Sequence, residues 1–411
     1  MNLEGPIGIV ELGDTNTKCL IFKIVKDKDI EILSTSITPS YGFKNDVVVN
    51  LSKATNAIRS CISLAENKAK VSLKKINVVF EQPDFLCTKF SKHKNIDGSK
   101  IYKDDIEFLL KEAKKQLILN DKSQSIIHIF NHNYIVDNKT FIEEPINVYA
   151  NTLSHEMTFI TAPKNNLKNI NQIFAECDLE IERFFSKIFT LGVKLLNQKE
   201  LQLGFGLINF ELEKISLGLF KNLALVHSIT LPIGINHITR DISKVCSLNL
   251  EESETIRNEI NFSFKGKSNL FDQNNYLKSD FFISTSFKKI SKELILNVVQ
   301  ARLNETLNLL KKQLIVPGFD LGSGANFLLE GEGCKLLNLE EYLISFFGRN
   351  FKKIEKINNK NDSLKNNFAP ILGAMKIIID GWETEALPNP SEKNIQKKGF
   401  FSKAINSLWK N

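Results

Sequence analysis

Apolar residues recur with two different spacings along the chain, and the spacings separate predicted strands from predicted helices. Apolar runs at residues 7–24 predict a strand, a turn and a second strand, and residues 203–220 repeat that arrangement. Apolar residues three and four apart predict helices, and the most regular of these spans residues 291–314. Because strands and helices alternate along most of the chain, the pattern predicts an α/β fold.

Residues 81–162 have a different texture and are predicted to form an inserted α+β unit. A polar stretch, residues 92–100, leads into a helix opened by Asp104 or Asp105, and two strands follow. His128 and His132 could share a face of the first of these strands as metal ligands. No cysteine or third histidine lies nearby in the sequence, so we interpret both as structural.

Shorter elements complete the pattern. Residues 319–331 are predicted as a strand that runs into a glycine-rich turn before a helix, a layout that can seat a nucleotide. The other predicted strands are residues 42–50, 76–80, 179–185 and 227–233. A helix capped by Ser52 is also predicted. The remaining predicted helices are residues 166–177, residues 234–243 with Thr239 and Asp241 in the first turn, residues 251–258 and residues 368–380.

Composition narrows the class of protein. A chain of 411 residues predicts two or more domains, and 42% apolar with 25% charged residues is ordinary globular material. The net charge of +7 is too small and too dispersed for a nucleic-acid footprint. Six scattered cysteines, no signal peptide and no apolar run long enough to span a bilayer together predict a cytoplasmic protein with reduced thiols.

The last residues, 397–411, predict an amphipathic helix behind a proline-containing linker, Leu387–Ser391. One face is apolar and aromatic and the other is basic, which suits the plane of an anionic membrane surface. The alternative is a terminal helix that docks on the protein's own core. A single tail would bind weakly and reversibly, so many tails on a polymer would be needed for firm attachment. The predicted membrane-binding residues are Lys397, Lys398, Phe400, Phe401, Lys403, Ile405, Leu408, Trp409 and Lys410.

The hairpins in the two halves and the late glycine-rich turn resemble the superfamily of actin, Hsp70 and the sugar kinases. More narrowly, the whole chain is similar to FtsA, the actin-like bacterial cell-division family. The resemblance is carried by the order of GFKNDVVVNLSKATNAIRSCISLAE (42–66), GINHITRDIS (234–243), SETIR (253–257), QARLNE (300–305), LGSGANFLLEG (321–331) and the tail.

The resemblance implies a two-lobed actin-like fold of the actin, Hsp70 and hexokinase type. It divides the chain into a first lobe (1–80 and 163–202), an inserted α+β subdomain (81–162), a second-lobe core (203–244 and 313–381), a partner-binding subdomain (245–312), a linker (382–396) and the amphipathic helix (397–411).

The resemblance also implies a nucleotide site. The residues that match it are Glu11, Gly13, Thr15, Lys18, Gly234, Glu254, Arg257, Gly324 and Ala325, with Ser323 in place of a glycine. The second phosphate loop is degenerate: Asn209, Glu211, Glu213 and Lys214 stand where the family has aspartate, glycine and threonine. Glycines let backbone amides approach a phosphate, and carboxylates repel it. We therefore expect ATP with Mg²⁺ to bind weakly or not at all, with little or no hydrolysis.

The family further implies filament formation and a place at the division site on the cytoplasmic face of the inner membrane. It implies recruitment of later division proteins and of the FtsZ polymer, the Z ring, through the FtsZ C-terminal peptide. Arg302 and Glu305 are the candidate contacts on the partner side, although a helix-surface salt bridge explains them nearly as well. The alternatives are a relative from pilus assembly or plasmid segregation, which would lack the tail, and an ATP-dependent phosphotransferase, which would need intact phosphate loops.

Overall fold

The structure, a computed structural model, divides the chain into two compact units. The first contains the described residues of Met1–Leu203, Gly218–Ser228 and Ile357–Asn411, and the second those of Gly204–Leu217 and Ile229–Lys356. The structure describes residues 5–25, 29–260, 269–282, 286–314, 326–348, 350–353 and 367–386.

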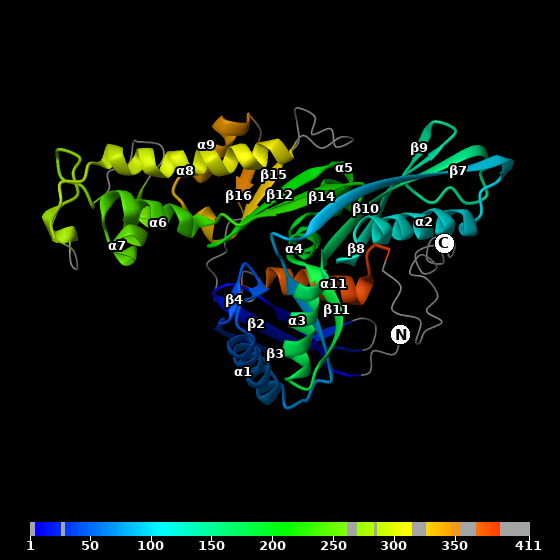
Figure 1. The fold of residues 1–411 in the computed structure, drawn as a ribbon, viewed down its shortest axis with the longest axis horizontal. Coiled ribbons are helices and arrows are strands. Elements are labelled where there is room, and N and C mark those ends of the chain that lie inside the picture. The colour runs from blue at the N-terminus through cyan, green and yellow to red at the C-terminus, as the bar shows by residue number, and fades with distance from the viewer. Residues whose placement is uncertain are drawn as a thin grey trace. The chain divides into compact units, whose positions relative to one another are not determined.

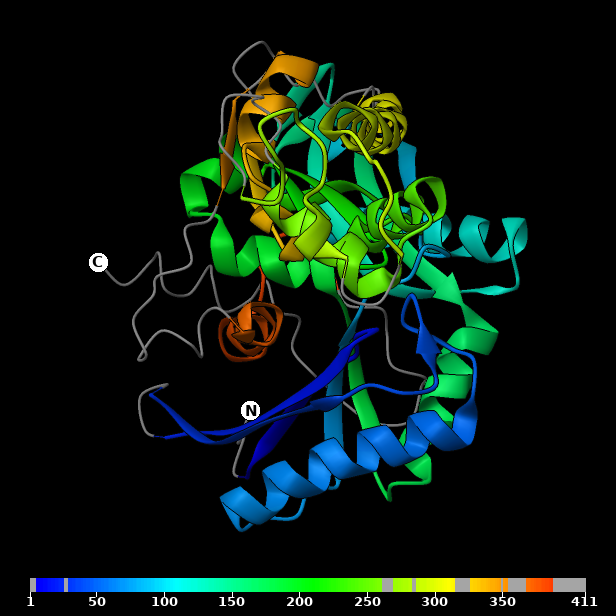
Figure 2. The same ribbon diagram turned by 90° about the vertical axis from the view of Figure 1, so that its left-hand side faces the viewer.

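A five-stranded sheet forms the base of the first unit, in the order β11-β6-β1-β2-β3. Strands β1, β6 and β11 run parallel, while β2 and β3 pair antiparallel as predicted for a hairpin. Helices α1 and α11 lie on opposite faces (Figure 2). The bounds are β1 Ile7–Glu11, β2 Asn16–Ile24, β3 Ile30–Pro39, α1 Leu51–Ala69, β6 Lys75–Phe80, α3 Lys164–Ala175, β11 Glu180–Ser186, α4 Lys187–Leu195, α5 Gln198–Leu203 and α11 Ala369–Asp380.

Two local predictions in this unit were wrong. The segment predicted as one strand is a small hairpin, β4 Phe43–Lys44 and β5 Val47–Val48, because Asn45 and Asp46 adopt positive φ in a two-residue turn. Helix α1 begins at Leu51, and its cap is Asn50, whose side chain accepts the Lys53 amide at 2.9 Å. Ser52 therefore lies inside the first turn.

The inserted α+β unit is a four-stranded sheet in the order β7-β10-β8-β9, with α2 along one face (Figure 1). Its elements are β7 Leu86–Lys100, α2 Lys103–Asn120, β8 Gln124–Val136, β9 Lys139–Phe141 and β10 Tyr149–Pro163. The polar stretch before the helix is the second half of β7, an edge strand in which Phe90 and Ile96 are buried and Lys94 reaches α2, with its Nζ 2.5 Å from Asp105 Oδ1. Asp105 accepts the Tyr102 amide at 2.7 Å, so α2 begins just before the predicted aspartates.

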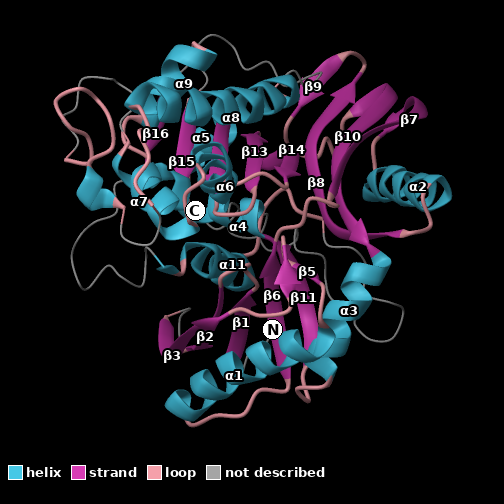
Figure 3. Cartoon of the chain, turned by 60° about the vertical axis from the view of Figure 1, so that its left-hand side comes forward, coloured by secondary structure: helices cyan, strands magenta, loops and turns pink. Residues whose placement is uncertain are grey.

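The sheet in the order β14-β13-β12-β15-β16 (Figure 3) supplies β12, β15 and β16 to the second unit, whereas residues Gly218–Ser228, which include most of β13 and β14, belong to the first unit. Helices α6, α7 and α8 pack on one another, and Ile295, Val299, Leu303, Leu307 and Leu310 form the buried stripe of α8 as predicted. The elements are β12 Phe205–Phe210, β13 Ile215–Lys221, β14 Ala224–Leu231, α6 Ile235–Cys246, α7 Leu250–Glu259, the 3₁₀ helix η2 Ser279–Phe281, α8 Lys292–Gln313, β15 Phe327–Glu330, the 3₁₀ helix η3 Glu332–Lys335, α9 Leu339–Phe347 and β16 Phe351–Lys353.

Several predictions in the second half need correction. Thr239 and Asp241 lie beyond the first turn of α6, because the helix begins at Ile235. Residues after the predicted glycine-rich turn form strand β15, not a helix, since Phe327, Leu328 and Leu329 pair in parallel with β12 and are buried.

The predicted boundary between the second lobe and the linker also needs correction. The closing helix α11 belongs to the first unit, where a side chain at Gly373 would lie 1.9 Å from the Thr190 carbonyl oxygen. The predicted linker begins too early, because Thr384, Glu385 and Ala386 are buried.

No helix within the described ranges is long and apolar enough to cross a bilayer. All six cysteines are free, as their spacing predicted.

Candidate functional site

Three charged side chains lie at the carboxyl edge of the first sheet. Glu11 ends β1, Glu81 follows β6 and Lys187 follows β11. Their exposed fractions are 4%, 1% and 2%. Because ligands of open α/β sheets bind at this edge, the first unit places its candidate site here.

Two lysines hold the Glu11 carboxylate. Lys18 Nζ lies 3.3 Å from Oε2, and Lys187 Nζ lies 3.3 Å from Oε1. Two ammonium groups occupy both oxygens and repel a divalent cation. Within the part of the chain that the structure describes, no three histidine, cysteine, aspartate or glutamate side chains are placed so that they could hold a metal ion. These residues therefore do not fit the Mg²⁺ ion that the family resemblance implied.

The hairpin of β1 and β2 brings the four predicted first-loop residues together. Glu11 and Lys18 face each other across the β1–β2 ladder. Gly13 lies in the turn, where a Cβ would stand 2.7 Å from the Asn16 carbonyl oxygen, so the turn needs a glycine. The exposed Thr15 accepts the Ser40 amide through its carbonyl oxygen at 2.9 Å. The structure thus brings the four residues together in one hairpin and adds Lys187, the first residue of α4.

The second loop is the turn between β12 and β13, and it occupies the start of α6. The Glu211 amide donates to the Lys214 carbonyl oxygen at 3.0 Å and closes the turn. The amides of Ile235 and Asn236, at the start of α6, donate to the carbonyl oxygens of Glu211 (3.0 Å) and Leu212 (2.8 Å). Free amides at a helix start bind phosphate. Here two of them already bind the loop itself.

The carboxylates of the second loop have partners of their own. Glu213 accepts from Arg240 Nη2 at 2.9 Å and from Asn236 Nδ2 at 2.8 Å. Burial alone would raise the pKa of Glu213, but these hydrogen bonds lower it overall. Glu211 lies 3.9 Å from the buried Lys214 Nζ, and Asn209 is buried at the end of β12. The start of α6 is therefore occupied by the second loop, and the loop carboxylates are paired within the protein.

Gly234, Glu254 and Arg257 lie close together through α6 and α7. A Cβ on Gly234 would stand 2.4 Å from the Leu212 carbonyl oxygen, so only glycine allows the loop this close. Arg257 is 5% exposed and donates to Asn236 Oδ1, Thr239 Oγ1 and Glu254 Oε1. Arg257 thereby ties α7 to the first turns of α6 and is engaged within the protein.

A strand followed by a glycine-rich turn and a helix was predicted around Gly324. The structure has this arrangement further along the chain, after β15. There Gly331 follows the strand, Gly333 lies within η3, and α9 comes next. Gly331 has φ +97°, and a Cβ on it would lie 2.5 Å from the Phe210 carbonyl oxygen and 2.8 Å from Asn209 Oδ1. The prediction placed the turn at Gly322 and Gly324, although Gly331 and Gly333 have the same spacing of two residues. Gly324 and Ala325 lie outside the described residues.

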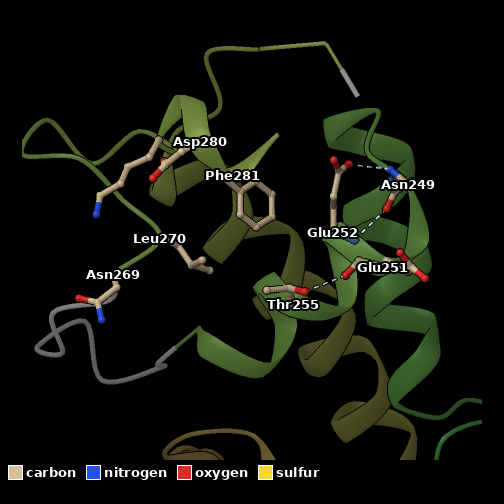
Figure 4. Close-up of a pocket in the computed structure, with 9 residues that line it drawn as sticks. Asn249, Glu251, Glu252, Thr255, Asn269, Leu270, Asp280 and Phe281 are labelled. Carbon is tan, nitrogen blue, oxygen red and sulfur yellow. Dashed lines mark hydrogen bonds between the residues drawn. The ribbon is translucent and has the colours of Figure 1, made fainter. Parts of the chain in front are cut away.

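A cavity of about 380 Å³ lies in the predicted partner-binding subdomain. Figure 4 shows Leu270 and Phe281 across from the start of α7, where Asn249 and Glu252 cap each other. Glu251, Glu252 and Asp280 make the lining acidic against one lysine, Lys278.

Arg302 and Glu305, the predicted partner contacts, form a surface salt bridge on α8. Arg302 Nη1 lies 2.6 Å from Glu305 Oε2, and its Nε lies 2.5 Å from Asp241 Oδ2. Arg302 therefore joins α8 to α6, and a quarter of its side chain stays exposed.

Comparison with known proteins identifies the relationship. A sequence profile of the SHS2 domain inserted in FtsA matches residues 86–161, which are the inserted sheet and α2. The cell division protein FtsA of Agrobacterium fabrum is 21% identical over 356 residues, covering 84% of this chain and 80% of its own. FtsA of Bacillus subtilis is 22% identical over 325 residues, covering 78% and 72%. The chain is related to the FtsA proteins.

Solved structures show that the fold is actin-like, as the resemblance to FtsA implied. The PilM–PilN type IV pilus biogenesis complex aligns with a TM-score of 0.60 and 12% identity, over 89% of this chain and 96% of that one. MreB5 of Spiroplasma citri bound to ADP aligns with a TM-score of 0.53 and 14% identity, over 92% and 98%. The inserted FtsA domain distinguishes the chain from a generic member of this fold.

The membrane-binding residues that the amphipathic pattern predicts lie outside the described residues. These are Lys397, Lys398, Phe400, Phe401, Lys403, Ile405, Leu408, Trp409 and Lys410.

Proposed function

We propose that this chain is an actin-like scaffold of bacterial cell division that attaches FtsZ polymers to the cytoplasmic face of the inner membrane. The observation that carries the proposal is the FtsA-type inserted domain, within a chain similar to FtsA over most of its length. The amphipathic segment 397–411 supplies the membrane contact, with aromatic residues at the acyl chains and lysines at the headgroups. Filament formation and recruitment of later division proteins belong to the same proposal.

The partner surface is the subdomain around α7 and α8. Arg302 and Glu305 are partly exposed there, and the acidic cavity beside the start of α7 adds a site for an apolar or basic side chain. The FtsZ C-terminal peptide is the proposed partner of this surface.

Nucleotide binding is weak in this proposal, and the protein is at most a very slow ATPase. Two amides at the start of α6 are taken by the second loop, and Glu11 is held by Lys18 and Lys187. The fold neighbour from Spiroplasma citri binds ADP, so the fold itself admits a nucleotide. ATP turnover by the purified protein at about 1 per second or faster, an ordinary enzyme rate, would contradict this part of the proposal.

Flotation with anionic vesicles tests the anchor directly. The full chain is compared with a chain that ends at Gln396, each alone and with FtsZ. We expect only the full chain to float, and FtsZ to float only when the full chain is present. If both chains stay at the bottom with and without FtsZ, the tail is no anchor and the similarity to FtsA describes ancestry alone.

The pilus-assembly alternative is less well supported. The likeness to the PilM–PilN complex shows the fold alone, at 12% identity, whereas the inserted domain matches FtsA.

A further inference from the structure

The five residues that follow α11 and Gly381 pair with the inserted sheet through an isolated β-bridge and two backbone hydrogen bonds. Glu385 pairs antiparallel with Phe130 of β8. The Asn131 amide donates to the Thr384 carbonyl oxygen at 2.8 Å, and the Ala386 amide donates to the Ile129 carbonyl oxygen at 2.7 Å. Figure 1 shows this segment, in red, beside β8. We name residues 382–386 the docking strand.

The docking strand uses an edge of β8 that the rest of the inserted sheet leaves open. Strand β10 lies on one side of β8, and β9 covers the other side only at residues 134–136. The docking strand covers the same side at residues 129–131. An exposed strand edge is a template for pairing, and this chain covers it with its own C-terminal segment.

Side chains fix the docking strand at both ends. Trp382 Nε1 and Thr384 Oγ1 donate to the Leu223 carbonyl oxygen at 2.6 and 2.8 Å. Ala386 enters the core cluster of the inserted domain, whose other buried members are Phe90, Ala113, Leu117, Ile129, Met157 and Phe159.

Glu385 is the central contact of the docking strand. Its carboxylate is 2% exposed, and one oxygen accepts hydrogen bonds from His128 Nδ1 at 2.5 Å and from Arg183. The Ser186 amide donates to His128 Nε2 at 2.9 Å, so the neutral imidazole carries its proton on Nδ1, facing Glu385. Burial would raise the pKa of Glu385, but Arg183 and His128 hold that pKa at about 2.

We propose that the docking strand completes the inserted domain and makes the start of the C-terminal tail part of it. A pull on the tail would then act on β8 through the paired backbone and on β11 through Arg183 and Ser186. The tail and the inserted domain behave as one mechanical unit in this proposal. The strand pairing itself does not rest on the proposed function, which enters only in naming the tail as the loaded segment.

Hydrogen exchange of the full-length protein tests the docking strand. We expect Glu385→Gln to speed exchange at the amides of Asn131 and Ala386 by about tenfold, because it removes the charge that pairs with Arg183. Ala386→Pro removes the amide that Ile129 accepts and should speed exchange at Asn131 in the same way. Glu383→Gln, an exposed neighbour in the same strand, is the matched control and should change nothing.

The outcomes separate this inference from the proposed function. Unchanged exchange at Asn131 in both variants would overturn the docking strand, as would an equal rise in β1 and β2, which indicates general loss of stability. Glu385→Gln keeps the tail, so it should still float on vesicles made of equal parts phosphatidylglycerol and phosphatidylcholine. Failure of the wild-type chain to float would count against the anchor and leave the exchange result to stand on its own.

Discussion

At the scale of single residues, buried histidines in the inserted domain make the stability of the fold depend on pH. His155 of β10 is fully buried and stacks on Tyr134 at 4.4 Å between ring centroids. Neither ring nitrogen has a hydrogen-bond partner among the described residues. Burial lowers the pKa of His155 to about 3, and that of His132, which lies near enough to interact, to about 4. Both histidines are therefore neutral in the folded protein at physiological pH.

We predict that His155→Leu makes the protein less sensitive to acid. The unfolded chain takes up a proton near its ordinary pKa of about 6.5, whereas the folded chain does not until about pH 3. Stability is therefore lost as the pH falls below about 6.5, by about 1.4 kcal/mol per pH unit from this residue. Between pH 7 and pH 5 the wild type should lose about 2 kcal/mol more than the variant, measured by urea unfolding.

His93→Leu is the control for this prediction. His93 is exposed on β7 and contacts Ser154 and Asn95 through its two ring nitrogens. Because His93 is exposed, its replacement removes no buried imidazole and should not reproduce the effect of His155→Leu. Equal slopes for the wild type and His155→Leu would show that His155 is protonated in the folded state, and the account of its burial would fail.

At the scale of single elements, the turn after β15 requires glycine at residue 331. We predict that Gly331→Ala destabilises the protein by about 1–3 kcal/mol, because a Cβ would enter the contact with Phe210 and Asn209 at a residue with φ +97°. Gly348→Ala is the matched control: Gly348 also has positive φ, +63°, but open space surrounds it. The control should cost only the backbone penalty of about 1 kcal/mol. Thermal or urea unfolding of both variants decides the matter, and equal losses would contradict the close approach.

The elements that sequence predicted well are those whose signal is local. The β1–β2 hairpin and the buried stripe of α8 follow from apolar spacing within one segment, and both were confirmed. Polar β7 was missed because only Phe90 and Ile96 are buried along it, so the strand lacks an apolar run. Lys187 joins Glu11, and Glu385 joins His128, through contacts between residues far apart in the sequence. No spacing rule predicts such contacts, so the docking strand was taken for linker.

In both halves of the chain, other groups of the protein engage the candidate phosphate loop. In the first unit, lysines from β2 and α4 neutralise Glu11. In the second unit, the β12–β13 turn binds the start of α6. At each candidate phosphate loop, the charged or polar groups therefore already bind other residues of the same unit. This occupation supports the proposed scaffold over the phosphotransferase alternative, which would need open phosphate loops.

Polymer-dependent attachment follows from the weakness of a single tail. One tail contributes a few apolar side chains at about 1.5–3 kcal/mol each and lysines at about 1 kcal/mol each, less the cost of folding a short helix. Once one tail on a polymer is bound, the next binds intramolecularly, and avidity can exceed single-site affinity about 10²-fold or more. We predict that FtsZ polymerised with GTP raises the fraction of full chain that floats on anionic vesicles, whereas FtsZ with GDP does not. A chain with Trp409→Ala should need a higher vesicle concentration under both conditions. Flotation that is equally strong without polymer would show that a single tail suffices, and the need for an array would be refuted.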